Sequence, residues 1–200
     1  MLLTSGQGLA LLRIGFGLYL IASAWDKTAK GWLTSGAPLR GTLFGNPNAT
    51  PPTAGAVGNP QGHDFYKAFL TDVVQPNVDL FAQLVTVGEW VAGILLLLGL
   101  FTALGSFVTI LLTTNYMLMK GFVNMSANSD RLFILAGIAF GLAAAGLVWG
   151  LDGRFRHLLA SNPLTRLLSG IPRLRSYYEP APGHAPAPEY ERDRQLTGTR

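Results

Sequence analysis

The sequence predicts an all-α polytopic membrane protein, a bundle of four transmembrane helices with short surface helices. Two observations carry this prediction. The apolar residues of the 200-residue chain are gathered into long runs, and only 13% of its residues are charged, about half the usual share. A bilayer core takes roughly 20 mainly apolar residues per helix, so four spans use about 80 residues and leave chain for a long loop and a tail.

The first predicted span runs from Gly8 to Trp25 and is interrupted only by Arg13. A cleaved signal peptide is the competing interpretation, because Ala22-Ser23-Ala24 resembles a small-residue cleavage site. However, no Lys or Arg precedes the apolar stretch, and Arg13 divides it. These features favour a retained helix.

A long irregular loop is predicted from Gly31 to Gly62, which is rich in Gly, Pro, Asn and Thr. The pairs Asn46-Pro47, Pro51-Pro52 and Asn59-Pro60 are turn signals and helix breakers. A loop of this length is uncommon in a compact domain and is usually functional or disordered.

The next segment, Asp64 to Val74, predicts a short amphipathic helix. Phe65, Phe69, Leu70 and Val73 share one helical face. Such a helix either lies on the membrane surface or packs against the preceding loop.

The second predicted span, Leu80 to Phe101, contains Glu89. Residues Thr102 to Gly105 are expected to make a tight connection to the third span, Ser106 to Phe122. A connection this short requires the two helices to be antiparallel neighbours.

A polar loop, Asn124 to Arg131, precedes the fourth predicted span, Leu132 to Leu151. This span carries Gly137-x-x-x-Gly141 and Gly146-x-x-x-Gly150. Small residues at this spacing let helices approach closely in lipid. We expect them to give a smooth face toward the bundle rather than a special dimer motif.

Residues 1–152 therefore form the predicted membrane domain, followed by a basic interfacial segment, 153–175, and a disordered tail, 176–200. Eight of the fifteen basic residues follow Leu151, and all eight are arginine. Because basic residues beside a span favour the cytoplasm, we expect both termini to be cytoplasmic and the 31–62 loop to be extracytoplasmic, in a bacterial inner membrane. In this orientation Lys27 and Lys30 lie on the outer side of the membrane, which is contrary to the preference of basic residues for the cytoplasmic side.

Arg13 and Glu89 are the ionisable residues inside apolar runs, where each costs roughly 2.5–3.5 kcal/mol at a helix centre. Counting from Trp25 and Asp79 places them about 18 Å and 15 Å from the outer surface, which predicts an ion pair. The pair either locks the bundle or takes part in binding or proton handling. Asn115 and Tyr116 in the third span could join the same polar site.

Missing residue types limit the chemistry further. The chain has no cysteine, and its three histidines lie outside the apolar runs. Cysteine-ligated clusters and a haem between intramembrane histidines are therefore excluded, and we predict no metal site and no cofactor within the chain, with quinone as the one candidate ligand. No nucleic-acid-binding motif is present.

The segment from Gly88-Glu89-Trp90 to Leu98-Gly99-Leu100-Phe101-Thr102-Ala103 resembles the central signature of the DoxX family of small membrane proteins. Leu12-Arg13-Ile14-Gly15, followed by Lys27, is similar to the family's first helix. The segment from Asp64-Phe65 to Pro76-Asn77, together with Asn115-Tyr116, resembles the DoxD-like branch, which includes the small membrane subunit of thiosulfate:quinone oxidoreductase.

This resemblance implies a four-helix bundle associated with redox enzymes or larger membrane complexes. We therefore expect a membrane subunit that contributes to quinone-linked oxidation, with a partner supplying the electron carrier. The alternative is a non-catalytic accessory subunit that stabilises a larger respiratory or photosynthetic complex. The protein's partners would then be lipid and other protein subunits.

Overall fold

The computed structural model describes residues 4–46, 48, 52–122 and 125–171. Regular structure in these ranges is helical, apart from one isolated bridge between Asn46 and Thr53. The long helices are α1 (Ser5–Ala29), α4 (Val78–Leu98), α5 (Thr102–Lys120) and α6 (Asn128–Leu142). The shorter ones are α2 (Ala37–Phe44), α3 (Asp64–Phe69), η1 (Leu70–Val74), η2 (Gln75–Asn77), η3 (Met125–Ala127), η4 (Ala145–Leu147), α7 (Leu151–Arg154), α8 (Arg156–Ser161) and α9 (Pro163–Ser169).

The prediction of an all-α polytopic membrane protein is confirmed. Within the described residues, three helical segments are long and apolar enough to cross a membrane: Ser5–Ala29, Asp64–Leu98 and Thr102–Lys120. Helix α6 packs along α5 as the fourth member of the bundle. Its 15 residues span only about 22 Å, less than a bilayer core of about 30 Å.

Two predicted boundaries around these helices are wrong. Thr102 to Gly105 is not a connection, because α5 begins at Thr102 and the turn lies earlier, at Gly99 to Phe101. The polar loop before the fourth span is also shorter than predicted, since α6 begins at Asn128.

The fourth predicted span, Leu132 to Leu151, is not one helix. Helix α6 ends at Leu142, and Ala144 has a left-handed φ of 45°. Of the two predicted glycine pairs, Gly137 and Gly141 do face α5, near Ser106, as a smooth helix surface requires. Gly146 and Gly150 lie instead in the irregular chain after the break.

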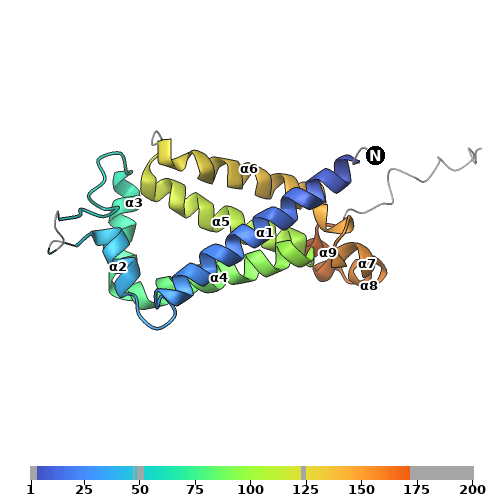
Figure 1. Cartoon of the computed structure of the whole chain (residues 1–200), viewed down its shortest axis with the longest axis horizontal. Coiled ribbons are helices and arrows are strands. Elements are labelled where there is room, and N and C mark those ends of the chain that lie inside the picture. Colours follow the sequence, from blue (N-terminus) through green and yellow to red (C-terminus); the bar gives the residue numbers. More distant parts are fainter. Residues whose placement is uncertain (1–3, 47, 49–51, 123–124, 172–200) are drawn as a thin grey trace, which may run out of the picture.

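The long helices pair α1 with α4 and α5 with α6. Helices α4 and α5 converge at their connecting turn and diverge toward the opposite end, which α2 and α3 cover (Figure 1). We call these the narrow end and the wide end. The start of α1 and helices α7 to α9 lie at the narrow end (Figure 1).

Close contact between α1 and α4 depends on two glycines. A methyl group on Gly17 would lie 2.8 Å from Leu97 Cα and 2.9 Å from the Gly93 carbonyl oxygen. A methyl group on Gly93 would lie 2.8 Å from a side-chain carbon of Ile21. These positions bring the two backbones together, as small residues do between membrane helices.

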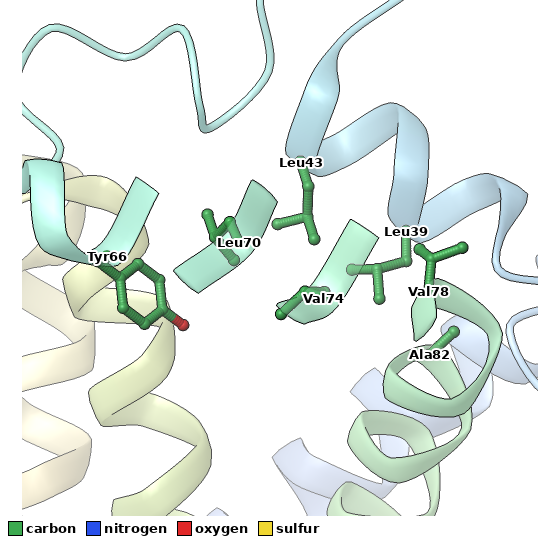
Figure 2. Close-up of a cluster of buried hydrophobic side chains, with 7 residues drawn as sticks. All are labelled: Leu39, Leu43, Tyr66, Leu70, Val74, Val78 and Ala82. Carbon is green, nitrogen blue, oxygen red and sulfur yellow. The ribbon is translucent and has the colours of Figure 1, made fainter. Parts of the chain in front are cut away.

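The wide end is closed by residues predicted as an irregular loop. Part of that segment forms α2, whose Leu39 and Leu43 pack against Tyr66, Leu70 and Val74 in a buried cluster with Val78 and Ala82 (Figure 2). We call α2, α3 and η1 the cap. It folds onto the bundle because α2 presents leucines four residues apart, which lie on one helical face.

The predicted amphipathic helix from Asp64 to Val74 is present, as α3 and the π-helical η1. Of the four residues on its predicted apolar face, Leu70 is buried within the chain and Phe69 is partly buried. Phe65 and Val73 are 65% and 43% exposed. The π-helical turn at Leu70–Val74 shifts the register, so the buried face continues to Val74.

In the basic segment predicted over 153–175, α7, α8 and α9 are short helices separated by breaks, and Pro163 begins α9. Leu158, Leu164 and Leu167 on these helices are exposed. Arg173, Arg175 and the predicted tail at 176–200 lie outside the described residues.

Candidate functional site

Glu89 is buried in the middle of α4, where a lone carboxylate would be strongly disfavoured. Its side chain is 2% exposed, and both carboxylate oxygens accept hydrogen bonds from Lys27 Nζ, at 2.9 and 2.8 Å. Lys27 lies in the last turn of α1 and also donates to Ser23 Oγ at 2.9 Å. The ion pair therefore joins α1 to α4 and compensates the buried charge of Glu89.

Tyr116 of α5 completes this group. Its hydroxyl donates to Glu89 Oε1 at 2.8 Å, and the Lys27 ammonium lies 5.8 Å from the centre of its ring. The same ammonium lies 5.6 Å from the centre of the Trp32 ring. Lys27, Glu89 and Tyr116 thus form a polar triad that draws one residue from each of three helices.

The predicted Arg13–Glu89 ion pair is wrong. The depth count assumed that Trp25 and Asp79 lie level with each other, but Gly17 of α1 lies against Gly93 and Leu97 of α4. Arg13 therefore reaches Leu96, which is seven residues beyond Glu89 and about 10 Å farther along α4. Lys27 reaches the carboxylate instead.

Arg13 lies at the narrow end, where it holds the helix termini together. It is fully buried and donates to the backbone oxygens of Leu96 and Trp149. Asp152, also fully buried, is the carboxylate whose charge interacts with Arg13.

Asp152 caps the start of α5. Its carboxylate accepts from the backbone amides of Phe101 and Thr102, at 2.8 and 2.9 Å, and from the Thr102 hydroxyl at 2.7 Å. A carboxylate at a helix N-terminus also interacts favourably with the helix dipole. Gly99, with φ of 63°, must stay free of a side chain because Arg13 occupies the space beside it.

Asn115 is placed near the cap. Its amide oxygen accepts from the Tyr66 hydroxyl at 2.9 Å, and its amide nitrogen donates to the Leu111 carbonyl at 2.7 Å. The hydrogen bond from Tyr66 links α3 to α5. Of the four predicted site residues, the structure therefore brings Glu89 and Tyr116 into contact, places Asn115 beside them on α5, and separates Arg13.

A cavity of about 750 Å³ lies between α4, α5, the end of α1 and the cap. Its polar lining includes Lys27, Tyr66, Asn115 and Tyr116, and its rim includes Asp26 and Lys30. The remaining wall is almost wholly apolar and includes Leu39, Phe69, Phe81, Leu84, Val85, Val108, Leu111 and Leu112. The volume lies within the range of small-molecule sites, which combine an apolar wall with a few polar groups.

Sequence reasoning missed Lys27, Tyr66 and Asp152 as site or pairing residues. Lys27 was placed at the outer surface, but a lysine one turn from a helix end has a side chain long enough to reach inward. Asp152 follows the last apolar run, and nothing in its local sequence indicates that it caps α5. Tyr66 could have been found, because it lies four residues before the apolar Leu70 on the same face.

A protein-family model described as DoxX matches residues 8–121, more than half of the chain. The matched region runs from α1 through α5 and contains the triad, the Tyr66–Asn115 pair and the cap. Comparison with curated proteins and with solved structures found no match.

Proposed function

Because the chain belongs to the DoxX family, we propose that it is the integral membrane subunit of a redox complex and that its cavity binds the ring of a membrane quinone. Members of this family are often associated with redox complexes. The resemblance to the DoxD-like branch supports the narrower assignment to quinone-linked oxidation in a bacterial inner membrane.

The cavity is the observation that carries the proposal. It is apolar enough for a quinone ring, and its lining includes Tyr116, Lys27 and Asn115. The single donor of Tyr116 and the three of Lys27 are directed at Glu89 and Ser23, so a ring oxygen would compete with Glu89 for a hydrogen bond. A ligand oxygen at Tyr116 therefore lies next to a buried charge pair.

This chain would bind the quinone and a partner would deliver the electrons. The sequence has no cysteine, and the described residues hold no group of three or more His, Asp or Glu side chains suited to a metal ion. A soluble or peripheral dehydrogenase is the expected electron donor. The dehydrogenase would then pass electrons to the bound quinone from the membrane surface next to the wide end.

The test is quinone binding by the purified protein in lipid nanodiscs, with a decyl-tailed benzoquinone as probe and empty nanodiscs as blank. Trp32 lines the cavity, so its fluorescence should be quenched on binding. Replacing Tyr116 by Phe removes one hydrogen bond, worth roughly 0.5–1.5 kcal/mol, and should weaken binding about threefold to tenfold.

The matched control is Tyr19→Phe, because Tyr19 is 55% exposed on α1 and does not line the cavity. Unchanged affinity in Tyr116→Phe, or equal weakening in both variants, would show that a quinone ring oxygen does not bind to Tyr116. No binding above the blank by the wild-type protein would reject the quinone proposal.

The alternative is a non-catalytic accessory subunit of a larger respiratory or photosynthetic complex. The cap argues against a segment that reaches out to wrap a partner, because α2 buries its leucines against α3 and η1 of the same chain. Isolation of a large complex without quinone traceable to this chain would favour the alternative.

A further inference from the structure

We infer that the cavity is loaded sideways from the lipid bilayer, through an opening between α4 and α5, and that its ligand is a quinone whose isoprenoid tail stays in that opening. This inference rests on the proposed function, since it assumes that the cavity takes a quinone. It adds the route of entry and the part of the ligand that each wall contacts.

Two leucines mark the opening. Leu84 of α4 and Leu111 of α5 both line the cavity, yet they are 56% and 52% exposed. The cavity is partly open to the outside, and we take the half-exposed residues of its lining to mark its mouth. Both leucines belong to the membrane-crossing segments, so what lies outside at this point is lipid.

The shape of the bundle produces the opening. Helices α4 and α5 are held together at the narrow end by their turn and by Asp152, and they diverge toward the cap (Figure 1). Gly88 leaves room for the side chain of Leu112 on α5, and both residues line the cavity. The cap then closes the wide end above the gap with its buried cluster (Figure 2).

The polar groups of the wall gather around the triad, between the apolar cap and a deeper apolar wall. Lys27 and Tyr116 lie toward the wide end, with Asp26 and Lys30 at the rim. Val108 lies eight residues before Tyr116 on α5, about 12 Å deeper. A ring with polar oxygens therefore fits near the triad, and an apolar chain fits along the deeper wall.

The competing route is entry of the ligand directly from water, through the rim of the cavity. Asp26 and Lys30 form an exposed ion pair there, with a separation of 2.6 Å. A polar, water-soluble ligand would enter past these residues and would gain little from contact with the apolar wall. Quinones with and without a tail distinguish the two routes, because both carry the same ring.

The experiment measures how fast quinone leaves the protein into lipid. Tagged protein in nanodiscs is loaded with the decyl-tailed benzoquinone and mixed with excess quinone-free vesicles. The protein is re-isolated at intervals and its retained quinone is extracted and quantified. Leu84→Trp and Leu111→Trp should each slow the exchange at least tenfold, because the indole narrows the opening.

The controls are Leu80→Trp and Phe107→Trp. These residues lie one turn from Leu84 and Leu111, are 54% and 61% exposed, and do not line the cavity. Both variants should exchange quinone at the wild-type rate. Lys30→Met tests the rim in the same assay and should leave the rate of the tailed quinone unchanged.

The same benzoquinone without its tail should bind at least tenfold more weakly than the decyl form. Equal exchange rates in all variants, together with equal affinity for the two quinones, would overturn lateral entry while leaving the quinone site in place. If the wild-type protein holds no quinone above empty nanodiscs, the proposed function itself fails. Should Leu84→Trp not fold, Leu84→Phe and Leu111→Phe give the same comparison with a smaller expected effect.

Discussion

Replacing Lys27 by Met should destabilise the protein far more than a change at a neighbouring lysine. Glu89 has a 2% exposed side chain and receives three hydrogen bonds, two of them from Lys27. Removing one partner of a buried ion pair costs about 3–5 kcal/mol, because the other charge is left without compensation. The hydrogen bond from Tyr116 remains and places the expected loss near the lower figure, about 3 kcal/mol.

The control is Lys30→Met, one turn later in sequence. Lys30 pairs with Asp26, but both side chains are well exposed, at 62% and 59%. Since exposed pairs contribute roughly 0–1 kcal/mol, this variant should unfold close to the wild type. Lys27 lies in the last turn of α1 and Lys30 directly follows the helix. Both substitutions remove one positive charge, so the difference in their stabilities reports mainly on burial.

The assay is reversible unfolding of the protein in mixed detergent micelles, with stability read from the denaturant midpoint. A double variant, Lys27→Met with Glu89→Gln, removes both charges and should recover part of the loss, because no unpaired charge is then buried. The reasoning is refuted if the Lys27 and Lys30 variants are equally stable. Strict additivity of the two substitutions in the double variant would refute it as well.

Three further predictions concern the fold around the site. Gly93→Ala should destabilise the α1–α4 contact by about 1–3 kcal/mol, whereas Gly15→Ala, which meets nothing within 4 Å, should be neutral or slightly stabilising in the same unfolding assay. Asp152→Asn should cost about 1–3 kcal/mol, because the amide cannot accept all three hydrogen bonds of the carboxylate; an unchanged midpoint would contradict its role as cap. Leu70→Ala should cost about 2–5 kcal/mol, and limited proteolysis should then cut the cap faster than in Val73→Ala, since Val73 is 43% exposed.

The sequence was sufficient for the helices but not for their partners. Apolar runs located α1, α4 and α5 within a few residues, because length and composition alone decide whether a segment can cross a bilayer. The pairing of Glu89 depends on how α1 and α4 are offset along their axes. That offset is set by the contact of Gly17 with Gly93, which no single helix reveals.

The end of α6 shows a different limit. Ala144 lies in a run of alanines, and alanine is the strongest helix former, yet it takes a left-handed φ of 45°. The reason lies elsewhere in the chain, since Arg13 binds the Trp149 carbonyl and Asp152 binds the start of α5. These contacts hold the segment that follows α6 against the turn between α4 and α5. Helix α6 must end before this segment so that Trp149 and Asp152 can make these contacts.

Two of the buried charged groups in the described part of the bundle, Arg13 with Asp152 and Lys27 with Glu89, differ in what their charges contact. At the narrow end, Arg13 and Asp152 direct their hydrogen bonds to backbone groups of the helix termini, and neither residue lines the large cavity. These contacts join the ends of the helices. At the wide end, Lys27 and Tyr116 line the cavity while their polar atoms contact Glu89. A ligand oxygen placed there would compete for these hydrogen bonds, so ligand binding must change the balance between Lys27 and Glu89. The two roles that the sequence suggested for one ion pair thus fall to different residues, with Arg13 and Asp152 joining the helix termini and the triad forming the proposed site.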